Sequence, residues 1–235
     1  MSPQVVILAG GLARRLGSLT KEKPKSLILI NNIPFIIHQL DYLKKQGIQK
    51  IHLCLGHFSD QILELLSKYS NLDLEISYSI DGDKQLGTGG AIKKALSFCE
   101  DNFFIQYGDT FLPINYIKVY EYFKALPNRQ SIMCIYKNNN LYDNSNIIYQ
   151  KNKIFKYDKN NFNEQMNYID YGLSFIVKKD LLKYLNKDII DLSEIYIKLI
   201  KEKMMMPYEV TQRFYEIGKI EGIKDTEYYL NLLEN

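Results

Sequence analysis

The first half of the chain alternates short apolar runs with segments of helical periodicity, and this alternation limits the possible folds more than any other feature. Ile36, Leu40 and Leu43, for example, recur at helical spacing in a segment that begins at Pro34 and ends before Gly47. The apolar runs predict strands at 4–9, 50–55, 72–80 and 102–109, and the periodic segments predict helices at 34–46, from 59 onward, at 88–99 and at 114–125. Strand–helix alternation of this kind predicts a parallel sheet with helices on both faces.

The second half changes to strand-like segments with shorter connections. Strands are expected at 131–136, 146–150, 153–158, 168–177 and 208–218, and helices at 192–203 and 222–233. We therefore expect one domain over residues 1–235, of the α/β class, in which a mainly parallel mixed sheet is flanked by helices and carries a small antiparallel annex. Such sheets bind ligands at the carboxyl ends of their strands, where this sequence places Gly10-Gly11 and Gly108.

Charge and composition argue against several classes of protein. The 235 residues include 30 basic and 27 acidic ones, a formal charge of +3, so we expect no nucleic-acid partner. Cys54, Cys99 and Cys134 lie far apart in apolar runs without the spacing of metal ligands, which indicates buried, reduced thiols in a cytoplasmic protein. We recognise no signal peptide and no apolar run of bilayer length, so no membrane association is expected.

The segment from Leu8 to Lys25 combines two glycines with several basic residues. It does not match the dinucleotide motif GxGxxG, because Leu12 stands where a glycine is needed, and no Gly-Lys-Ser/Thr follows as in a P-loop. What remains is a strand end whose glycines expose backbone N–H groups to an anion, while Arg15 and Lys25 neutralise phosphates. A surface loop whose glycines merely turn the chain is the alternative interpretation.

The same segment resembles the signature of nucleotidyltransferases that act on sugar 1-phosphates, L-A-G-G-x-G-T-R-L followed by a Pro-Lys pair. The matching residues are Leu8, Ala9, Gly10, Gly11, Arg15, Leu16, Pro24 and Lys25. The chain departs from the signature at Ala13 and Arg14, where Gly and Thr are usual. The departure at Arg14 leaves open how that part of the phosphate site is built.

Further motifs of this family follow in order along essentially the whole chain. They are QLGTGGA at 85–91, YGDT with Asp109, KYDK with Asp158 and Lys159, YIDYG at 168–172 and RFYEIG with Glu216. Their combination is most similar to D-glycero-D-manno-heptose 1-phosphate guanylyltransferases. The resemblance implies a Rossmann-like nucleotidyltransferase fold.

The resemblance also implies a reaction, in which a sugar 1-phosphate attacks the α-phosphorus of a nucleoside triphosphate and pyrophosphate leaves. A phosphate monoester is largely dianionic near neutral pH, its second pKa being about 6, so no general base is needed. Catalysis then rests on positioning and charge neutralisation, for which Arg15, Lys25 and Lys159 are the expected catalytic residues. Asp109 and Glu216 are the expected ligands of a Mg²⁺ cofactor, a cation that prefers oxygen ligands.

The remaining site residues are expected to bind the two substrates. Those assigned to the nucleotide are Leu8, Ala9, Gly10, Gly11, Gln85, Gly87 and Thr88, and those assigned to the sugar are Asn146, Asp158, Asp170 and Gly172. Thr88 has a second interpretation as the cap of a helix that starts there.

Several functions stay open at this level. GTP and a manno-configured heptose or hexose 1-phosphate are the favoured substrates, for surface-polysaccharide synthesis, and a homodimer is compatible with the resemblance. A cytidylyl- or uridylyltransferase acting on another phosphorylated sugar or polyol is the first alternative, and a catalytically silent nucleotide-sugar-binding subunit is the second. A glycosyltransferase would use a DxD metal motif; Asp81-Gly82-Asp83 has that form, but it lies in the loop that leads to QLGTGGA.

Overall fold

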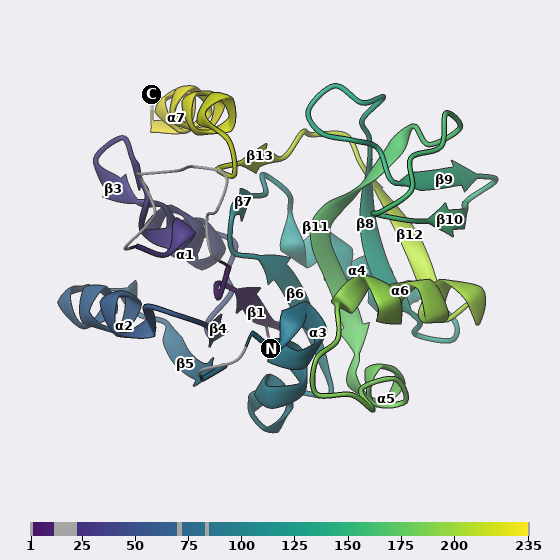
Figure 1. Ribbon diagram of the computed structural model, residues 1–235, viewed down its shortest axis with the longest axis horizontal. Coiled ribbons are helices and arrows are strands. Elements are labelled where there is room, and N and C mark those ends of the chain that lie inside the picture. Colours follow the sequence, from purple (N-terminus) through teal and green to yellow (C-terminus); the bar gives the residue numbers. More distant parts are fainter. Residues whose placement is uncertain (1, 12–22, 70–71, 83–84, 235) are drawn as a thin grey trace.

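The computed structural model of the chain describes residues 2–11, 23–69, 72–82 and 85–234. A twisted sheet runs through its centre, and the first half supplies four adjacent parallel strands in the order β5-β4-β1-β6 (Figure 1). Their bounds are Gln4–Leu8 for β1, Lys50–Leu55 for β4, Glu75–Ile80 for β5 and Asn102–Tyr107 for β6. The parallel sheet predicted from strand–helix alternation is thus confirmed.

The second half continues the sheet with strands of mixed direction. β11, Tyr168–Val177, runs antiparallel to both β6 and β8, Ser131–Lys137, and β12, Met205–Val210, runs parallel to β8. The expected antiparallel annex is the hairpin of β9, Ile147–Gln150, and β10, Lys153–Tyr157. Two separate two-stranded pairs complete the strands: β2, Leu29–Ile30, with β3, Ile33–Pro34, and β7, Thr110–Phe111, with β13, Tyr215–Glu216.

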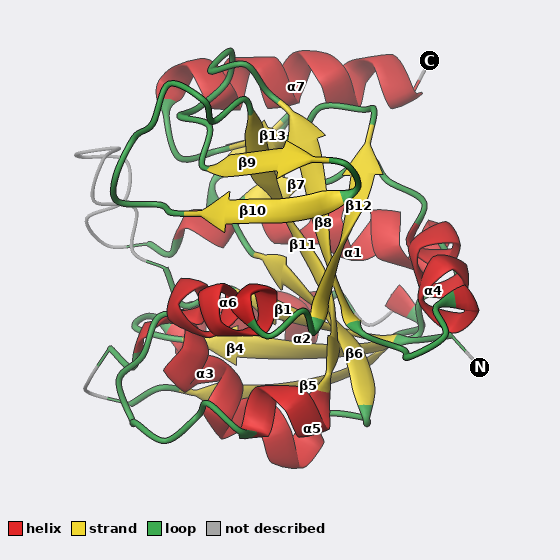
Figure 2. Cartoon of the chain, turned by 90° about the vertical axis from the view of Figure 1, so that its right-hand side faces the viewer, coloured by secondary structure: helices red, strands yellow, loops and turns green. Residues whose placement is uncertain are grey.

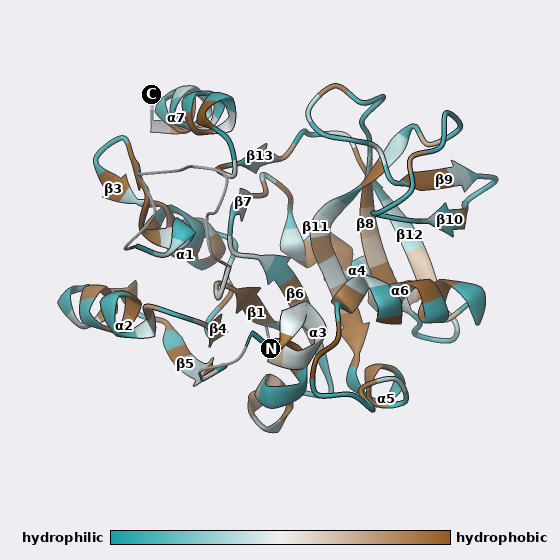
Figure 3. Cartoon of the chain, viewed as in Figure 1, coloured by the Kyte–Doolittle hydropathy of each residue, from teal (hydrophilic) through white to brown (hydrophobic). Residues whose placement is uncertain are grey.

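Helices cover both faces of the sheet because successive strand residues point to opposite sides. On β1, Val5 and Ile7 belong to the apolar cluster that includes residues of α1, α2 and α4, whereas Val6 belongs to the cluster that includes residues of α3 and α6. The bounds are Phe35–Lys45 for α1, Ser59–Lys68 for α2, Gly87–Ala95 for α3, Tyr116–Ala125 for α4 and Leu192–Lys201 for α6. Figure 3 accordingly shows β1 and β8 in the brown of hydrophobic residues. The core therefore lies in two layers, one on each face.

The last helix, α7, Ile220–Glu234, forms a third, smaller core at one end of the molecule. Leu230 belongs to this core together with Phe111 of β7, with Ile217, which directly follows β13, and with Ile30 and Phe35. Figure 2 shows α7 lying along this end, beside β13 and β7. This packing supports the β7–β13 pair, which contains Glu216 and directly follows Asp109.

Some boundaries differ from the sequence expectation. The helix predicted at 88–99 ends at Ala95 and tightens into a 3₁₀ turn, Leu96–Phe98. The strand predicted over 208–218 is divided, because β12 ends at Val210 and β13 pairs with β7 outside the main sheet. The short helix α5, Lys178–Leu182, was not expected, since five residues give no periodicity to detect. The three cysteines are buried and free, as predicted.

His52 is a fully buried residue of β4 whose ring stacks on Phe98 at a centroid distance of 4.9 Å. Its ring nitrogens lie 2.8 Å from the Ser77 hydroxyl and 3.1 Å from the Ser79 hydroxyl. Burial penalises the charged ring and lowers the pKa of His52 to about 4. His52 therefore stays neutral in the folded protein down to about pH 4, whereas in the unfolded chain, with a pKa of about 6.5, it already binds a proton at higher pH.

We predict that this residue makes stability fall as the pH drops. Between pH 6.5 and 4 the unfolded state binds more protons at His52 than the folded state does. The free energy of unfolding should therefore fall by about 3 kcal/mol over this range. His52→Gln should flatten this part of the pH profile, measured by urea unfolding from pH 7 to 4. The exposed His57 provides the control, since His57→Gln should keep the wild-type slope. Equal slopes for His52→Gln and wild type would contradict the prediction.

Candidate active site

Three parallel strands end side by side, and glycines follow each of them. A Cβ on Gly56, after β4, would lie 2.6 Å from the carbonyl oxygen of Gly10, after β1. A Cβ on Gly108, after β6, would lie 2.7 Å from the carbonyl oxygen of Leu8. Gly56 and Gly108 are therefore required by the close packing of neighbouring backbone segments. Gly11 differs, because a Cβ there would meet no described atom within 4 Å, and the residue is exposed.

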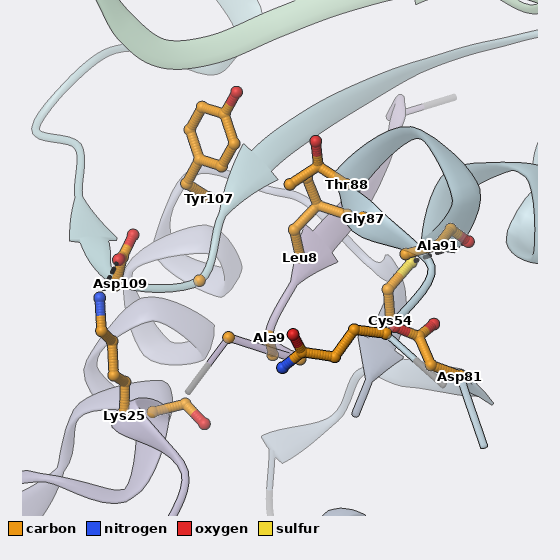
Figure 4. Close-up of a pocket in the computed structure, with 15 residues that line it drawn as sticks. Leu8, Ala9, Lys25, Cys54, Asp81, Gly87, Thr88, Ala91, Tyr107 and Asp109 are labelled. Atoms are coloured by element: carbon orange, nitrogen blue, oxygen red, sulfur yellow. Dashed lines mark hydrogen bonds and ion pairs between the residues drawn. The ribbon is translucent and has the colours of Figure 1, made fainter. Parts of the chain in front are cut away.

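The first cavity, of about 410 Å³, opens at these strand ends. All seven residues that the sequence assigned to the nucleotide line it: Leu8, Ala9, Gly10, Gly11, Gln85, Gly87 and Thr88. Lys25, Tyr107 and Asp109 line one side of it, and Cys54 and Asp81 line the opposite side (Figure 4). The strand order β6-β1-β4-β5 sets this separation, since Asp109 follows β6 and Asp81 follows β5.

Thr88 does not cap its own helix. α3 begins at Gly87, with Leu86 in the cap position and no side-chain cap. The Thr88 hydroxyl instead donates to the Asp191 carboxylate at 3.1 Å and accepts from the backbone N–H of Leu192 at 2.8 Å. Thr88 thus joins the start of α3 to the start of α6, in the cavity wall.

Lys25 and Asp109 form an ion pair in this cavity. The Lys25 Nζ lies 2.9 Å from Asp109 Oδ2, and the two side chains are 18% and 30% exposed (Figure 4). The turn that carries Asp109 is held from below by Gln39 of α1, whose amide donates to the carbonyl oxygens of Tyr107 and Thr110. The backbone around Asp109 is therefore held in place by Gln39. Lys25 contacts Asp109 from the 3₁₀ turn Lys25–Leu27.

A second cavity, of about 620 Å³, adjoins the first and shares Tyr107 and Asp109 with it. The remaining predicted residues among those that the structure describes line this cavity: Asn146, Asp158, Lys159, Asp170, Gly172 and Glu216. Arg15, the other predicted catalytic residue, lies outside the described residues. Residues from both halves of the chain therefore meet across Tyr107 and Asp109.

Lys159 is held at the boundary between the cavities. Its Nζ donates to the Tyr107 hydroxyl at 2.9 Å and lies 3.7 Å from the Asp170 carboxylate. Asp170 is 4% exposed and also accepts from the Tyr157 hydroxyl and the Gly172 N–H, both at 3.0 Å. The Asp170 carboxylate is therefore already bonded within the protein, and it positions Lys159.

Gly172 lies at a β-bulge in β11, between Asp170 and Ser174, where pairing with β8 shifts register. Its φ of +90° is a conformation that side-chain-bearing residues rarely adopt, and a Cβ would lie 3.3 Å from the Tyr107 ring. Bulges of this kind redirect a strand beside a site. Here the bulge brings β11 against Tyr107.

Asp158 and Asn146 shape the far wall of the second cavity. The Asp158 carboxylate accepts from the backbone N–H groups of Asn160 and Asn161, which lowers its pKa. The Asn146 side chain accepts from the Asp170 N–H, and its carbonyl accepts from the Asp158 N–H. Both residues therefore fix the backbone around the cavity that they line.

Glu216 is brought beside Asp109 by the β7–β13 pair, in which Glu216 is opposite Thr110 and the Ile217 N–H donates to the Asp109 carbonyl. Burial, and then the negative charge of Asp109, raise the pKa of Glu216, while Lys25 acts against the shift. Two carboxylates that repel each other in a partly buried site suit a divalent cation, which takes one or two protein carboxylates together with phosphate oxygens and water. The donor set is thus of the kind that Mg²⁺ accepts.

Several wall residues were missed by sequence reasoning. Tyr107 directly precedes Gly108 and Asp109, and its place at a strand end could have indicated it. Lys219 and Asp143 form an ion pair of 3.3 Å in the second cavity; Asp143 belongs to a polar loop that gave no signal of order.

None of the three histidines is among the described residues that line either cavity. In the described part of the chain, no helix is long and apolar enough to cross a membrane.

The sequence is similar to those of known nucleotidyltransferases. The chain is 41% identical over 116 residues to a D-glycero-alpha-D-manno-heptose 1-phosphate guanylyltransferase of Campylobacter jejuni, covering 49% of this chain and 52% of that protein. A protein of the same name from Aneurinibacillus thermoaerophilus is 39% identical over 119 residues, covering 50% of this chain and 51% of that protein. These matches span about half the length of each relative.

The fold comparison covers nearly the whole chain. The crystal structure of HddC from Yersinia pseudotuberculosis complexed with GMP-PN superposes with a TM-score of 0.81 and 25% identity, over 97% of this chain and 100% of that one. The expected nucleotidyltransferase fold is thereby confirmed. A family model described as nucleotidyl transferase matches residues 4–144, which include β1, the first cavity's glycines and Asp109. The chain belongs to the nucleotidyl transferase family.

Proposed function

We propose that the chain transfers a nucleotidyl group from a nucleoside triphosphate, with GTP favoured, to a heptose or manno-type hexose 1-phosphate, and releases pyrophosphate. The observation that carries this proposal is the pair of adjoining cavities that share Tyr107 and Asp109, with Lys25 and Lys159 at the junction. A nucleotide in the first cavity and a sugar phosphate in the second would meet between these lysines. The named relatives support the choice of guanylyl transfer to a heptose.

Charge neutralisation explains how these residues would act. Lys25 would lie against the α-phosphate and Lys159 against the attacking sugar phosphate, so that two anions can approach each other. The attacking oxygen belongs to a phosphate that is already ionised, which agrees with cavity walls that hold no histidine among the described residues. Tyr107 and Asp170 would keep Lys159 in place before the sugar phosphate binds.

Asp109 and Glu216 are the residues that would hold Mg²⁺. A bound Mg²⁺ supplies positive charge to the triphosphate and to the leaving pyrophosphate. Lys25, whose Nζ lies 2.9 Å from Asp109 Oδ2, would be free to bond to the phosphates if a cation bound to Asp109 in its place.

The proposal is tested by pyrophosphate release with Mg²⁺, crossing GTP, ATP, CTP, UTP and dTTP with a panel of heptose and hexose 1-phosphates. We expect turnover that requires GTP, a manno-configured 1-phosphate and the metal together. The same chain with chelator added, and each substrate alone, are the controls. Release of pyrophosphate without a sugar phosphate would contradict transfer, and silence with every pair would leave the chain without the proposed activity.

Loss of the Lys25 charge should slow transfer. A hydrogen bond to a charged group contributes about 1.5–3 kcal/mol, so Lys25→Gln should lower kcat/KM at least about tenfold. Lys68→Gln removes an exposed lysine of α2 and should leave kcat/KM unchanged. Thermal unfolding of both variants separates folding from catalysis. An unchanged kcat/KM in folded Lys25→Gln would remove this residue from the mechanism.

Gly11 and Gly56 provide a matched pair. Because no described atom lies within 4 Å of a Cβ built on Gly11, Gly11→Ala should keep the wild-type stability to within about 0.5 kcal/mol and weaken GTP binding by obstructing the phosphates. Gly56→Ala should instead cost about 1–3 kcal/mol of stability, because its Cβ would meet the Gly10 carbonyl. Urea unfolding and calorimetric titration with Mg²⁺·GTP measure the two effects. Unweakened GTP binding by Gly11→Ala would contradict a close approach of the phosphates at this point.

A further inference from the structure

The Asp81-Gly82-Asp83 segment has no part in the mechanism described so far, yet the structure brings Asp81 into the first cavity. Asp81 directly follows β5, and its backbone N–H donates to the carbonyl of Leu55. Figure 4 shows its carboxylate beside Cys54, on the far side of Ala9 from Lys25 and Asp109. Three strand spacings, together about 14 Å, separate the ends of β6 and β5, a length comparable to that of a nucleoside monophosphate.

This placement fixes which part of a nucleotide Asp81 would meet. If the phosphates lie against Lys25 and Asp109, the sugar 1-phosphate lies toward β11 and the base lies toward β5. Asp81 is then at the base end of the cavity. Gln85, which also lines the cavity, carries an amide that can donate to a base carbonyl.

The Asp81 carboxylate lacks bonding partners within the described part of the chain. It is partly buried, and none of the hydrogen bonds or ion pairs among those residues involves its side chain. Burial raises its pKa, and the charge of Lys94 acts against the shift. A partly desolvated acceptor without a partner among the described residues is stabilised by donors that a ligand brings.

Resting on the proposed function, we propose that Asp81 is the residue that selects guanine. Its two carboxylate oxygens accept the adjacent N1–H and 2-amino N–H of guanine, since an ionised carboxylate only accepts and can do so with both oxygens. Uracil and thymine offer one N–H flanked by two carbonyl oxygens that a carboxylate repels. Adenine and cytosine present a ring-nitrogen acceptor beside their amino group. Guanine alone among these bases places two donors side by side.

The test pairs a change in the base with a change in the protein. ITP carries hypoxanthine, which keeps N1–H and the 6-carbonyl but lacks the 2-amino group. Wild type should bind Mg²⁺·GTP about 10- to 100-fold more tightly than Mg²⁺·ITP in calorimetric titrations, because one hydrogen bond to a charged acceptor is lost. In Asp81→Asn this ratio should disappear or reverse, since the amide group opposes the 2-amino donor. Asp60→Asn, an exposed change on α2, should keep the wild-type ratio.

The outcomes separate this inference from the proposed function. Equal binding of GTP and ITP by wild type overturns the role of Asp81 without need of any variant. An undiminished preference of Asp81→Asn for GTP over ITP also overturns it, as does tightest binding of UTP or dTTP by wild type. In each of these cases pyrophosphate release can still establish nucleotidyl transfer. If no triphosphate binds to wild type, the proposed function itself fails.

Discussion

The whole site depends on the close parallel packing of β1 between β4 and β6. Gly10, Gly56 and Gly108 let three chain segments leave the sheet with their backbones in contact, and a Cβ on Gly56 or Gly108 would lie too close to a neighbouring carbonyl oxygen. The carboxyl ends of parallel strands all face one edge of a sheet. The described residues that directly follow β1, β4, β5 and β6 consequently lie at the same edge of the sheet, and strand direction alone places them there.

The second half adds what parallel strands cannot provide. β11 enters the sheet antiparallel to β6, so its first residues, not its last, lie at the edge where the other strands end. The bulge at Gly172 then turns Asp170 toward Lys159. The β7–β13 pair, held by the small core beneath α7, brings Glu216 from the end of the chain to Asp109. Polar residues far apart in sequence thus come together through backbone pairing.

Sequence reasoning predicted the strands and helices of the first half well, because their apolar periodicity is strong and their ends carry glycine or proline. It also assigned residues that all line the two cavities wherever the structure describes them. It could not foresee that Thr88 bonds to Asp191, that Asp170 serves Lys159, or that β13 leaves the main sheet, because these depend on contacts between distant segments. Asp81 lies in the segment leading to QLGTGGA, but sequence reasoning could not place its side chain in the first cavity, because strand order sets its surroundings.

Tyr107 and Asp109 belong to the walls of both cavities, and this sharing has a thermodynamic meaning. A molecule in one cavity that displaces Lys159 from the Tyr107 hydroxyl, or Lys25 from Asp109, alters the surface that the other cavity offers to its own occupant. Linkage then requires the converse, that the second occupant change the affinity for the first by the same factor. Any ligand that moves one of these two contacts would therefore couple the two cavities, because Tyr107 and Asp109 belong to both walls.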